Sequence, residues 1–319
     1  MRRRNVAQLA ILLVLGLGVL FSLMAFDQPG RRETELLEVS VIIREADSTG
    51  WSAARQGMEQ AAADLGAELR FLTLSRANSV EEQRTLLERE VEGGADAVVL
   101  VPADPEALSG DVAQAAGSTK IVTMESDMAR AGASACITVD NAALGRALGQ
   151  AALNGVEAGG EVLLVNSAPG SAGVDLRLDE AARVLEEAGR SSSVCMASEG
   201  VDLAETLERT LRARRPDAVL AFEPAALEQA ARLSQALERP PLVYGAGATG
   251  AVASYLERGN ITLIAAQNEF TAGYLAVEAA VRAARGAVLP PVAPLAFSVI
   301  RQEDMYDTDN QKLLFPMTR

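Results

Sequence analysis

Short runs of apolar and β-branched residues alternate with longer amphipathic segments along most of this chain, and this alternation limits the possible folds more than any other feature. Four such runs come before residue 126, and a segment with helical spacing follows each of the first three. The predicted strands are 39–43, 68–74, 97–101 and 120–125, and the predicted helices are 51–65, 80–92 and 105–116. Strands and helices that alternate in this way form a parallel sheet with helices on both faces. We therefore expect an α/β fold.

The segment 135–149, ACITVDNAALGRALG, divides this pattern into two halves. Ile137 and Val139 favour a short strand, and Asp140 and Asn141 can cap the helix that follows. The pattern then restarts, with predicted strands at 161–166, 193–197, 218–222, 242–245, 261–267 and 296–300, and predicted helices at 174–188, 203–213, 225–237, 251–257 and 269–285. We expect two doubly wound parallel-sheet lobes with a hinge at the crossing, and make no prediction for 304–319.

The chain begins with MRRRN, and an apolar run covers residues 6–26. A helix over this run would be about 31 Å long, which is enough to cross the hydrocarbon core of a bilayer. The three arginines before it would hold the short end in the cytoplasm. Because small residues do not occupy the positions expected before a cleavage site, we favour residues 1–26 as an uncleaved membrane anchor over a removed signal. Residues 27–37 form a polar tether, and the remainder would be extracytoplasmic, held by this single pass or exported if the segment is cleaved.

The composition excludes several classes of function. The chain contains no histidine, which excludes Ser-His and Cys-His nucleophile systems and removes the commonest metal ligand, whereas carboxylate chemistry remains possible. The formal net charge of −14 argues against nucleic acid as a partner, because phosphates require a basic surface. Cys136 and Cys195 fall in different predicted lobes, and whether they pair stays open. We expect a protein that is not an enzyme and that has no metal site.

One motif suggests a different class of protein. The segment from Gly245 to Gly250, GAGATG, follows a predicted strand and precedes a predicted helix, and Glu269 lies at about the right distance beyond it. This arrangement matches the G-x-G-x-x-G fingerprint of dinucleotide-binding sites. Small residues are so common in this chain that the match carries little weight. We therefore expect no cofactor.

Five segments, in the same order along the chain, resemble the type I periplasmic solute-binding proteins of the ribose and galactose group. They are VSVIIREADSTGWSAARQGMEQAAADLGAEL, GGADAVVLVPADPEAL, KIVTMESD, ITVDNAALGRALG and GNITLIAAQNEFTAGYLAVEAA. The resemblance covers about residues 38–300. It implies two lobes joined by a hinge of three chain segments, and a ligand held in the cleft between the lobes, where the carboxyl ends of the strands face one another.

The resemblance also implies where the chain crosses between the lobes. The three crossings would lie at 139–141, 267–268 and about 294–297, with Asp140, Asn141 and Asn268 as hinge residues. The first lobe would then comprise 38–139 and 268–295, and the second lobe 140–267 and 296–319.

Three residues match ligand contacts of the family. Trp51 occupies a position where the family stacks an aromatic ring on its ligand, although it could instead pack within its lobe. Arg177 matches an arginine that contacts the sugar, and the alternative is a solvated arginine on the surface of a helix. Gln267 matches a glutamine at the second crossing, which could contact the ligand or only hydrogen-bond within the hinge.

At other positions the chain departs from the family pattern. Ser48 replaces an asparagine, Glu125 and Ser126 replace an aspartate–arginine pair, Glu223 replaces an asparagine, and Ala246 replaces an aspartate that receives sugar hydroxyls. The candidate ligand-binding residues are Ser48, Trp51, Glu125, Ser126, Arg177, Glu223, Ala246 and Gln267. If Glu125 and Glu223 face each other without a cation, their like charges should raise one pKa. The remaining set suits a polyol, a modified sugar or a ligand that carries an amine.

The sequence therefore predicts an extracytoplasmic solute-binding protein that closes its lobes on a sugar or sugar derivative and delivers it to an ABC transporter permease. The alternative is a membrane-tethered sensor that presents its closed form to a receptor or histidine kinase. Both readings make the N-terminal segment a membrane attachment, and neither requires a bond to be made or broken.

Overall fold

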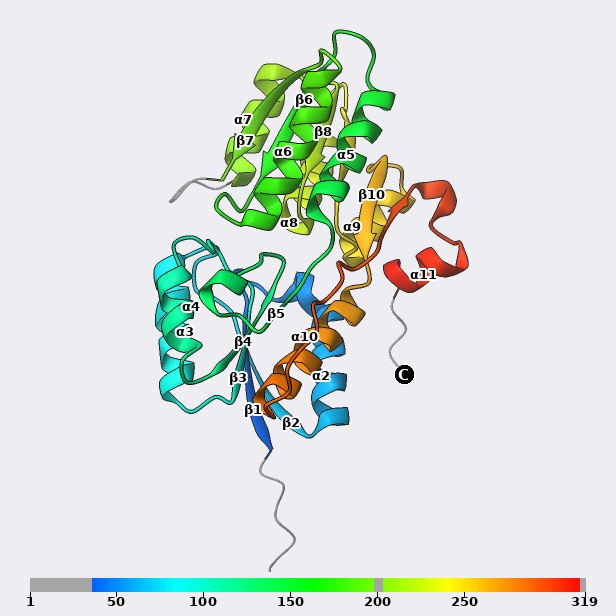
Figure 1. Ribbon diagram of the computed structural model, residues 1–319. Helices are drawn as coiled ribbons and strands as arrows, with labels where there is room; N and C mark the ends of the chain where they lie inside the picture. Colours follow the sequence, from blue (N-terminus) through cyan, green and yellow to red (C-terminus); the bar gives the residue numbers. More distant parts are fainter. Residues whose placement is uncertain (1–35, 198–202, 316–319) are drawn as a thin grey trace, which may run out of the picture. The chain divides into compact units, whose positions relative to one another are not determined.

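The computed structural model describes residues 36–197 and 203–315 (Figure 1). Leu37–Arg319 form one compact unit. The predicted anchor over residues 1–26 and most of the predicted tether lie outside the described residues. Within the part of the chain that is described, no helix has the length and apolar character needed to span a membrane.

The first sheet has five parallel strands in the order β2-β1-β3-β4-β5. These strands are β1 (Leu37–Ile42), β2 (Ala67–Leu72), β3 (Ala97–Leu100), β4 (Lys120–Met124) and β5 (Ala135–Ile137). The helices that belong to this sheet are α2 (Ser52–Leu65), α3 (Val80–Glu92), α4 (Ser109–Ala115) and α10 (Glu269–Ala284), and short 3-10 turns occupy Thr49–Trp51 and Ala129–Ala131. We call this set of elements the first lobe.

Helices cover both faces of the first sheet (Figure 1). Val39 and Val41 of β1 pack with residues of α2 and α10 on one face. Ile42 packs with residues of α3 and α4 on the other face. Because neighbouring side chains of a strand point to opposite faces, a strand buried on both sides must be apolar at nearly every position, which is the pattern of β3.

The second sheet has six strands in the order β11-β10-β9-β8-β6-β7. These strands are β6 (Glu161–Asn166), β7 (Ser191–Met196), β8 (Ala218–Ala221), β9 (Leu242–Ala246), β10 (Leu263–Gln267) and β11 (Phe297–Ile300). The helices are α5 (Asn141–Gly155), α6 (Ala172–Glu187), α7 (Leu203–Arg214), α8 (Pro224–Ser234), α9 (Gly250–Glu257) and α11 (Thr308–Leu314), with a 3-10 turn at Gln302–Asp304. Helices α5 and α6 cover one face, and α7, α8 and α9 cover the other. We call this set the second lobe.

The prediction of a wholly parallel second sheet was wrong at its edge, because β11 is antiparallel to β10. The chain leaves β10 at Gln267 and returns from the first lobe at the same end, where Phe297 pairs with Gln267. A strand that starts beside the end of its neighbour can only run back along it. The other neighbouring pairs of this sheet are parallel, as expected.

Most predicted elements occur within a few residues of their expected positions, and two differ. Helix α4 begins at Ser109 instead of 105, because the Asp104 carboxylate accepts hydrogen bonds from the backbone N–H groups of Glu106 and Ala107 and holds a turn there. Helix α11 lies in the C-terminal segment 304–319, for which we make no prediction, and Leu314 packs in the core of the second lobe.

Three segments carry the chain between the two lobes, after β5, after β10 and before β11. The first and third segments lie side by side, since Val139 and Leu295 form a parallel bridge. Asp140 and Asn268 each cap the helix that follows, by accepting a hydrogen bond from the backbone N–H of Ala143 and Thr271 at 2.8 Å. The first two crossings therefore end in well-defined helix starts, and the third leads into β11. The residue boundaries of the lobes stay predictions.

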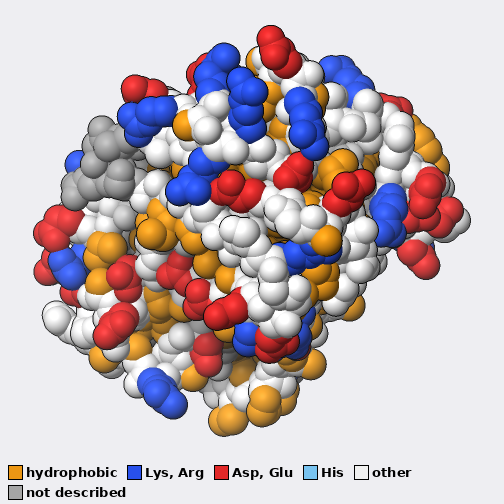
Figure 2. All heavy atoms as spheres, turned by 90° about the horizontal axis from the view of Figure 1, so that it is seen from above, with side chains coloured by type: hydrophobic (Ala, Val, Ile, Leu, Met, Phe, Trp, Pro, Cys, Tyr) orange, Lys and Arg blue, Asp and Glu red, His pale blue; other side chains and the backbone are white. Residues whose placement is uncertain are grey.

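The surface charge is mixed. The face shown in Figure 2 carries both basic and acidic side chains. Several arginines pair with an acid of their own helix, for example Arg55 with Glu59 at 2.9 Å and Arg212 with Glu208 at 2.8 Å. Such pairs neutralise positive charge locally instead of gathering it into the basic surface that phosphates require.

Helices α2 and α10 approach each other closely through glycines. A Cβ atom added at Gly57 would lie 1.9 Å from the carbonyl oxygen of Phe270, and one added at Gly273 would lie 1.9 Å from that of Ala54. Both distances are far below van der Waals contact, so any side chain at either position forces the helices apart.

We therefore expect Gly57→Ala to lower the free energy of unfolding by at least about 2 kcal/mol, because the helix pair must separate. Urea denaturation measures the change. The matched control is Gly110→Ala in α4, where an added Cβ meets no atom within 4 Å. That control should raise stability by about 0.5–1 kcal/mol through helix propensity. Equal effects of the two substitutions would contradict the close packing.

Candidate functional site

A cavity of about 680 Å³ lies between the two lobes, at the carboxyl ends of their strands. Arg44 and Glu125 follow β1 and β4 of the first sheet, and Glu223 follows β8 of the second sheet. Trp51 lies in the 3-10 turn before α2 and lines the cavity. Gln267 is the last residue of β10, at a crossing between the lobes. Side chains from both lobes and from the crossing thus line one space, as expected for sheets whose carboxyl ends face each other.

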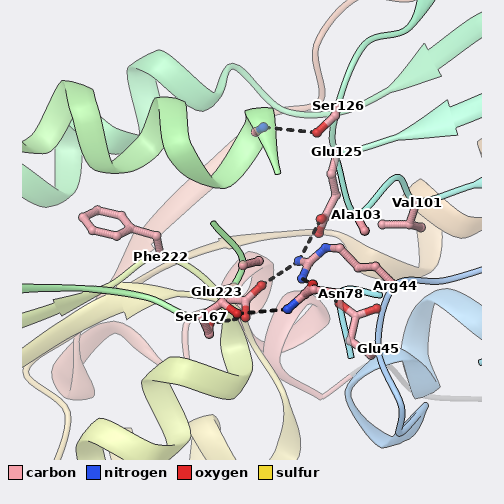
Figure 3. Close-up of polar contacts among 12 residues, drawn as sticks. Arg44, Glu45, Asn78, Val101, Ala103, Glu125, Ser126, Ser167, Phe222 and Glu223 are labelled. Atoms are coloured by element: carbon pink, nitrogen blue, oxygen red, sulfur yellow. Dashed lines mark hydrogen bonds and ion pairs between the residues drawn. The ribbon is translucent and has the colours of Figure 1, made fainter. Parts of the chain in front are cut away.

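Arg44 is the central cation of this site (Figure 3). Its Nη2 donates to Glu223 Oε2 at 2.6 Å and to Glu125 Oε2 at 3.1 Å. Its Nη1 lies 3.4 Å from Glu45 Oε1 and donates to Asn78 Oδ1 at 3.2 Å. The Arg44 side chain is only 3% exposed. Three carboxylates from different parts of the chain therefore share one buried guanidinium.

The network around Arg44 joins the two lobes. Arg44 and Asn78 belong to the first lobe, whereas Glu223 and Ser167 belong to the second. The Ser167 hydroxyl donates to Glu223, and Asn78 Nδ2 donates to the Ser167 carbonyl at 3.0 Å. A further contact between the lobes is the hydrogen bond from the backbone N–H of Gly173 to Ser126 Oγ at 3.1 Å.

The charges in this network stabilise one another. Burial disfavours the charged form of Arg44, but Glu223, Glu45 and Glu125 outweigh that effect and raise its pKa. Burial also disfavours a charged Glu125, and the attraction of Arg44 and then of Arg177 overcomes it, so that the pKa of Glu125 falls. The sequence predicts a raised pKa only if Glu125 and Glu223 face each other without a cation. Arg44 contacts both carboxylates, so this case does not arise.

Two other carboxyl groups of the cavity have raised pKa values. Burial raises the pKa of Glu45 to about 7, and repulsion by Glu125 and Glu223 adds to it although Arg44 opposes it. Burial likewise raises the pKa of Glu269 to about 7. Both oxygens of Glu269 accept from Gln267 Nε2, at 3.1 Å.

Glu125 and Asn141 connect the site to the first crossing. Glu125 has a positive φ of 64°, which only a strong local requirement sustains in a residue with a side chain. In this conformation its carbonyl accepts from Thr138 Oγ1 at 3.0 Å and from Asn141 Nδ2 at 3.2 Å, while its carboxylate reaches Arg44. The carbonyl of Glu125 thus contacts the hinge segment, and its carboxylate contacts Arg44 in the cavity.

Two hydrogen bonds to protein groups fix the side chain of Arg177. Its Nε donates to Asn141 Oδ1 at 2.7 Å, and its Nη1 donates to the carbonyl of Phe222 at 2.9 Å. The residue is 5% exposed and lines the cavity. The alternative of a solvated arginine on a helix surface is therefore wrong, whereas a ligand contact for Arg177 stays a prediction.

The structure brings most of the predicted site residues together. Six of them line the cavity, namely Trp51, Glu125, Arg177, Glu223, Ala246 and Gln267. Trp51 also packs against the core of the first lobe, so both of its expected roles remain compatible with its position. Ser48 and Ser126 are not among the lining residues. Ser48 precedes the 3-10 turn before α2, and Ser126 is buried with its hydroxyl bonded to Gly173.

Sequence reasoning missed several polar residues of the site. These are Arg44, Glu45, Asn78, Ser167 and Glu269. Arg44 and Glu45 lie between the predicted strand 39–43 and the predicted helix 51–65, and they are the first charged residues after the buried run VSVII. A charge directly after the carboxyl end of a buried parallel strand is the signal that could have identified them.

The glycines of GAGATG have a packing role. A Cβ atom added at Gly247 would lie 2.5 Å from Pro224 Cγ, and one added at Gly245 would lie 2.5 Å from the carbonyl oxygen of Ala221. Gly247 also has a positive φ of 121°. Close packing of β9 against β8 and α8 therefore accounts for these two glycines. Among the described residues, no group of three or more His, Cys, Asp and Glu side chains is placed to hold a metal ion, and Cys136 and Cys195 are both free.

One protein family matches this chain, and many solved structures have a similar fold. The model of the family described as periplasmic binding protein domain matches residues 39–287. A carbohydrate transporter solute-binding protein from Agrobacterium radiobacter, in complex with D-arabinose, has a TM-score of 0.81 at 19% identity and covers 88% of this chain and 100% of its own. An ABC transporter solute-binding protein from Agrobacterium vitis with bound D-fucose has a TM-score of 0.78 at 17% identity, covering 87% and 100%. GanP, a glucose-galactose binding protein from Geobacillus stearothermophilus, has a TM-score of 0.76 at 19% identity, covering 85% and 99%. No curated protein matches the chain at a significant level.

Removal of the central cation should destabilise the protein strongly. We expect Arg44→Met to lower the free energy of unfolding by about 3–5 kcal/mol, because it leaves buried carboxylates without their partner. Urea denaturation measures the loss. The control Arg183→Met removes an exposed arginine that pairs with Glu180 and Glu187 on the surface of α6, and its effect on the free energy of unfolding should be much smaller. A loss in Arg44→Met no larger than in this control would contradict the central role of Arg44.

The raised pKa values of Glu45 and Glu269 predict that stability falls as the pH rises. With a pKa of about 7 in the folded state against 4.5 as the ordinary value, each group keeps a proton that the unfolded chain has already lost. The contribution of these two groups to stability is therefore greatest below their ordinary pKa and decreases as the pH rises toward about 7. Urea midpoints at about pH 5.5 and about pH 8 measure this loss.

Glu269→Gln provides the check on that assignment. It should remove part of the decrease in stability between the two pH values, whereas Glu59→Gln, on the exposed face of α2, should leave the decrease unchanged. If the decrease in Glu269→Gln equals that of the unmodified protein, Glu269 does not titrate in this range.

Proposed function

We propose that this chain, which belongs to the periplasmic binding protein domain family, captures a small polar ligand, a sugar or sugar derivative, by closing its two lobes. The observation that carries the proposal is the cavity of about 680 Å³ lined by polar side chains of both lobes at the carboxyl ends of their strands. A space of this size suits a small molecule. A ligand held there contacts both lobes at once and so stabilises the closed arrangement.

The chemistry of the lining supports a carbohydrate-like ligand. Trp51 offers an aromatic ring for the C–H side of a sugar, and Arg177 and Gln267 offer donors and acceptors for hydroxyl groups. Solved proteins with the same fold bind D-arabinose and D-fucose according to their descriptions. The positions of Ser48 and Ser126 outside the cavity leave these two residues without a direct part in the proposed binding.

Closure would take place at the three crossings. Asp140 and Asn141 mark the start of the helix after the first crossing, and Asn268 marks the start of the helix after the second. Rotation of short extended segments between fixed elements is the usual form of a hinge. The Arg44–Glu223 ion pair and the Asn78–Ser167 hydrogen bond would then form as the lobes meet and break as they part.

The proposed partner of the closed form is an ABC transporter permease, which would receive the ligand. Residues 6–26 would tether the chain to the cell membrane, and the two lobes would lie on the extracytoplasmic side. Binding and release complete this function, and no bond of the ligand changes. The descriptions of the solved carbohydrate transporter and ABC transporter proteins support this assignment.

The single tryptophan of the chain gives a direct test. The full chain, in a detergent without a sugar headgroup, is titrated with pentoses, hexoses, polyols and amino sugars while tryptophan emission is recorded. We expect a saturable change in tryptophan emission with one class of compound, since Trp51 lines the cavity. The same compound at about 100 times its dissociation constant should stabilise the fold by about 2.7 kcal/mol, which a thermal melt detects.

Trp51→Phe separates a ligand contact from a distant optical effect. This variant should bind the same compound more weakly by calorimetry, and its melting temperature without ligand should stay close to that of the unmodified protein. No change in emission and no thermal shift with any compound would rule out the carbohydrate assignment.

A further inference from the structure

The lining of the cavity has an excess of negative charge. Two arginines line it, Arg44 and Arg177. Six acidic residues line it, namely Glu45, Asp47, Glu125, Glu223, Glu228 and Glu269. A neutral sugar would leave this imbalance as it is. A ligand that brings positive charge would reduce it.

Both arginines are already engaged by protein groups. Arg44 contacts Glu223, Glu125 and Glu45 through its two terminal nitrogens. Arg177 uses its Nε and Nη1 for Asn141 and the carbonyl of Phe222. Neither arginine forms an ion pair with Glu269, and the attraction of Arg177 only partly opposes the effect of burial on that carboxyl group. Arg44 reaches only one oxygen of Glu45.

Two buried acceptor atoms of the cavity lack a donor. Glu45 Oε2 and Gln267 Oε1 are both buried without a hydrogen-bond partner. Gln267 directs its amide nitrogen to Glu269, so its unpaired oxygen and the Glu269 carboxylate lie on neighbouring groups of one crossing. Buried acceptors without donors are costly, and a ligand rich in N–H donors would satisfy them.

The protonation of Glu45 and Glu269 fits a role as counter-charges for a cation. Burial raises the pKa of each carboxyl group to about 7, so near neutral pH each keeps a proton part of the time. A cation nearby would favour the ionised form and release that proton. Trp51 adds an aromatic face, which also attracts cations.

We infer that the ligand carries a protonated amino group, as an amino sugar or amino polyol does, and that the carboxylates of Glu45 and Glu269 supply its counter-charge. This inference rests on the proposed function, since it names the class of ligand for the same cavity. The hydroxyl groups of such a ligand would use the remaining polar groups, including the free acceptor of Gln267.

The test compares amino sugars with neutral sugars of the same shape. The full chain, in a detergent without a sugar headgroup, is titrated calorimetrically near neutral pH with D-glucosamine, D-galactosamine and D-mannosamine, and with D-glucose, D-galactose, D-mannose and the N-acetyl derivatives. We expect at least one amino sugar to bind about tenfold or more tightly than its neutral counterparts, equivalent to about 1.4 kcal/mol. Titration in buffers with different ionisation enthalpies should show proton release on binding.

Two variants locate the effect. Glu269→Gln and Glu45→Gln should each weaken binding of the amino sugar by about tenfold and reduce proton release. The loss should be larger for the amino sugar than for its neutral counterpart, because a carboxamide keeps the shape but not the charge. Glu59→Gln, outside the cavity, is the control and should change neither. Unchanged affinity for the amino sugar in both cavity variants would overturn the inference.

The outcomes separate this inference from the proposed function. If a neutral sugar binds as tightly as or more tightly than its amino counterpart, the inference is wrong and the sugar-binding function stands. If none of these compounds binds, and none of the pentoses and polyols of the tryptophan titration binds either, the proposed function fails and the inference fails with it.

Discussion

The burial of one guanidinium group determines how the site is arranged. Arginine keeps its charge in proteins, so a side chain that is 3% exposed requires carboxylates around it. Arg44 forms ion pairs with Glu45 in its own loop, with Glu125 at the end of another strand of its sheet, and with Glu223 in the other lobe. Because Glu223 must come within 2.6 Å of Arg44, the carboxyl ends of the two sheets are brought face to face. The cavity is the space that this pairing leaves beside it.

The ion pairs also connect the hinge to the cavity through a closed ring of contacts. Each member bonds the next, or is its neighbour in the chain, in the order Arg44, Glu125, Asn141, Arg177, Phe222, Glu223 and again Arg44. The positive φ of Glu125 allows its carbonyl to face the first crossing while its carboxylate faces Arg44. Buried ion pairs contribute little net stability compared with apolar packing, but they tolerate few alternative arrangements. We infer that this ring serves mainly to fix one closed geometry.

The fold was largely predictable from the sequence because it depends on local patterns. Strands buried on both faces and helices with one apolar face leave a periodicity that can be read residue by residue, as in β3 and α5. The direction of β11 depends instead on where the chain returns from α10, which no local pattern records. The site shows the same contrast between local patterns and contacts that depend on distant parts of the chain. Glu125, Arg177 and Glu223 were found because they stand at family positions, whereas the role of Arg44 depends on a partner 179 residues away.

The charges of the cavity connect ligand selection with closure. Glu45, Glu125 and Glu269 approach from the first lobe, while Glu223 and Glu228 approach from the second. Two like charges about 8 Å apart cost about 2 kcal/mol at an effective dielectric constant of about 20. Closing the lobes without a ligand, or on a neutral one, therefore concentrates negative charge, which Arg44 and Arg177 offset only in part. A cationic group of the ligand would offset the rest only when both lobes surround it, so the same carboxylates that select the ligand would make the closed state depend on its presence.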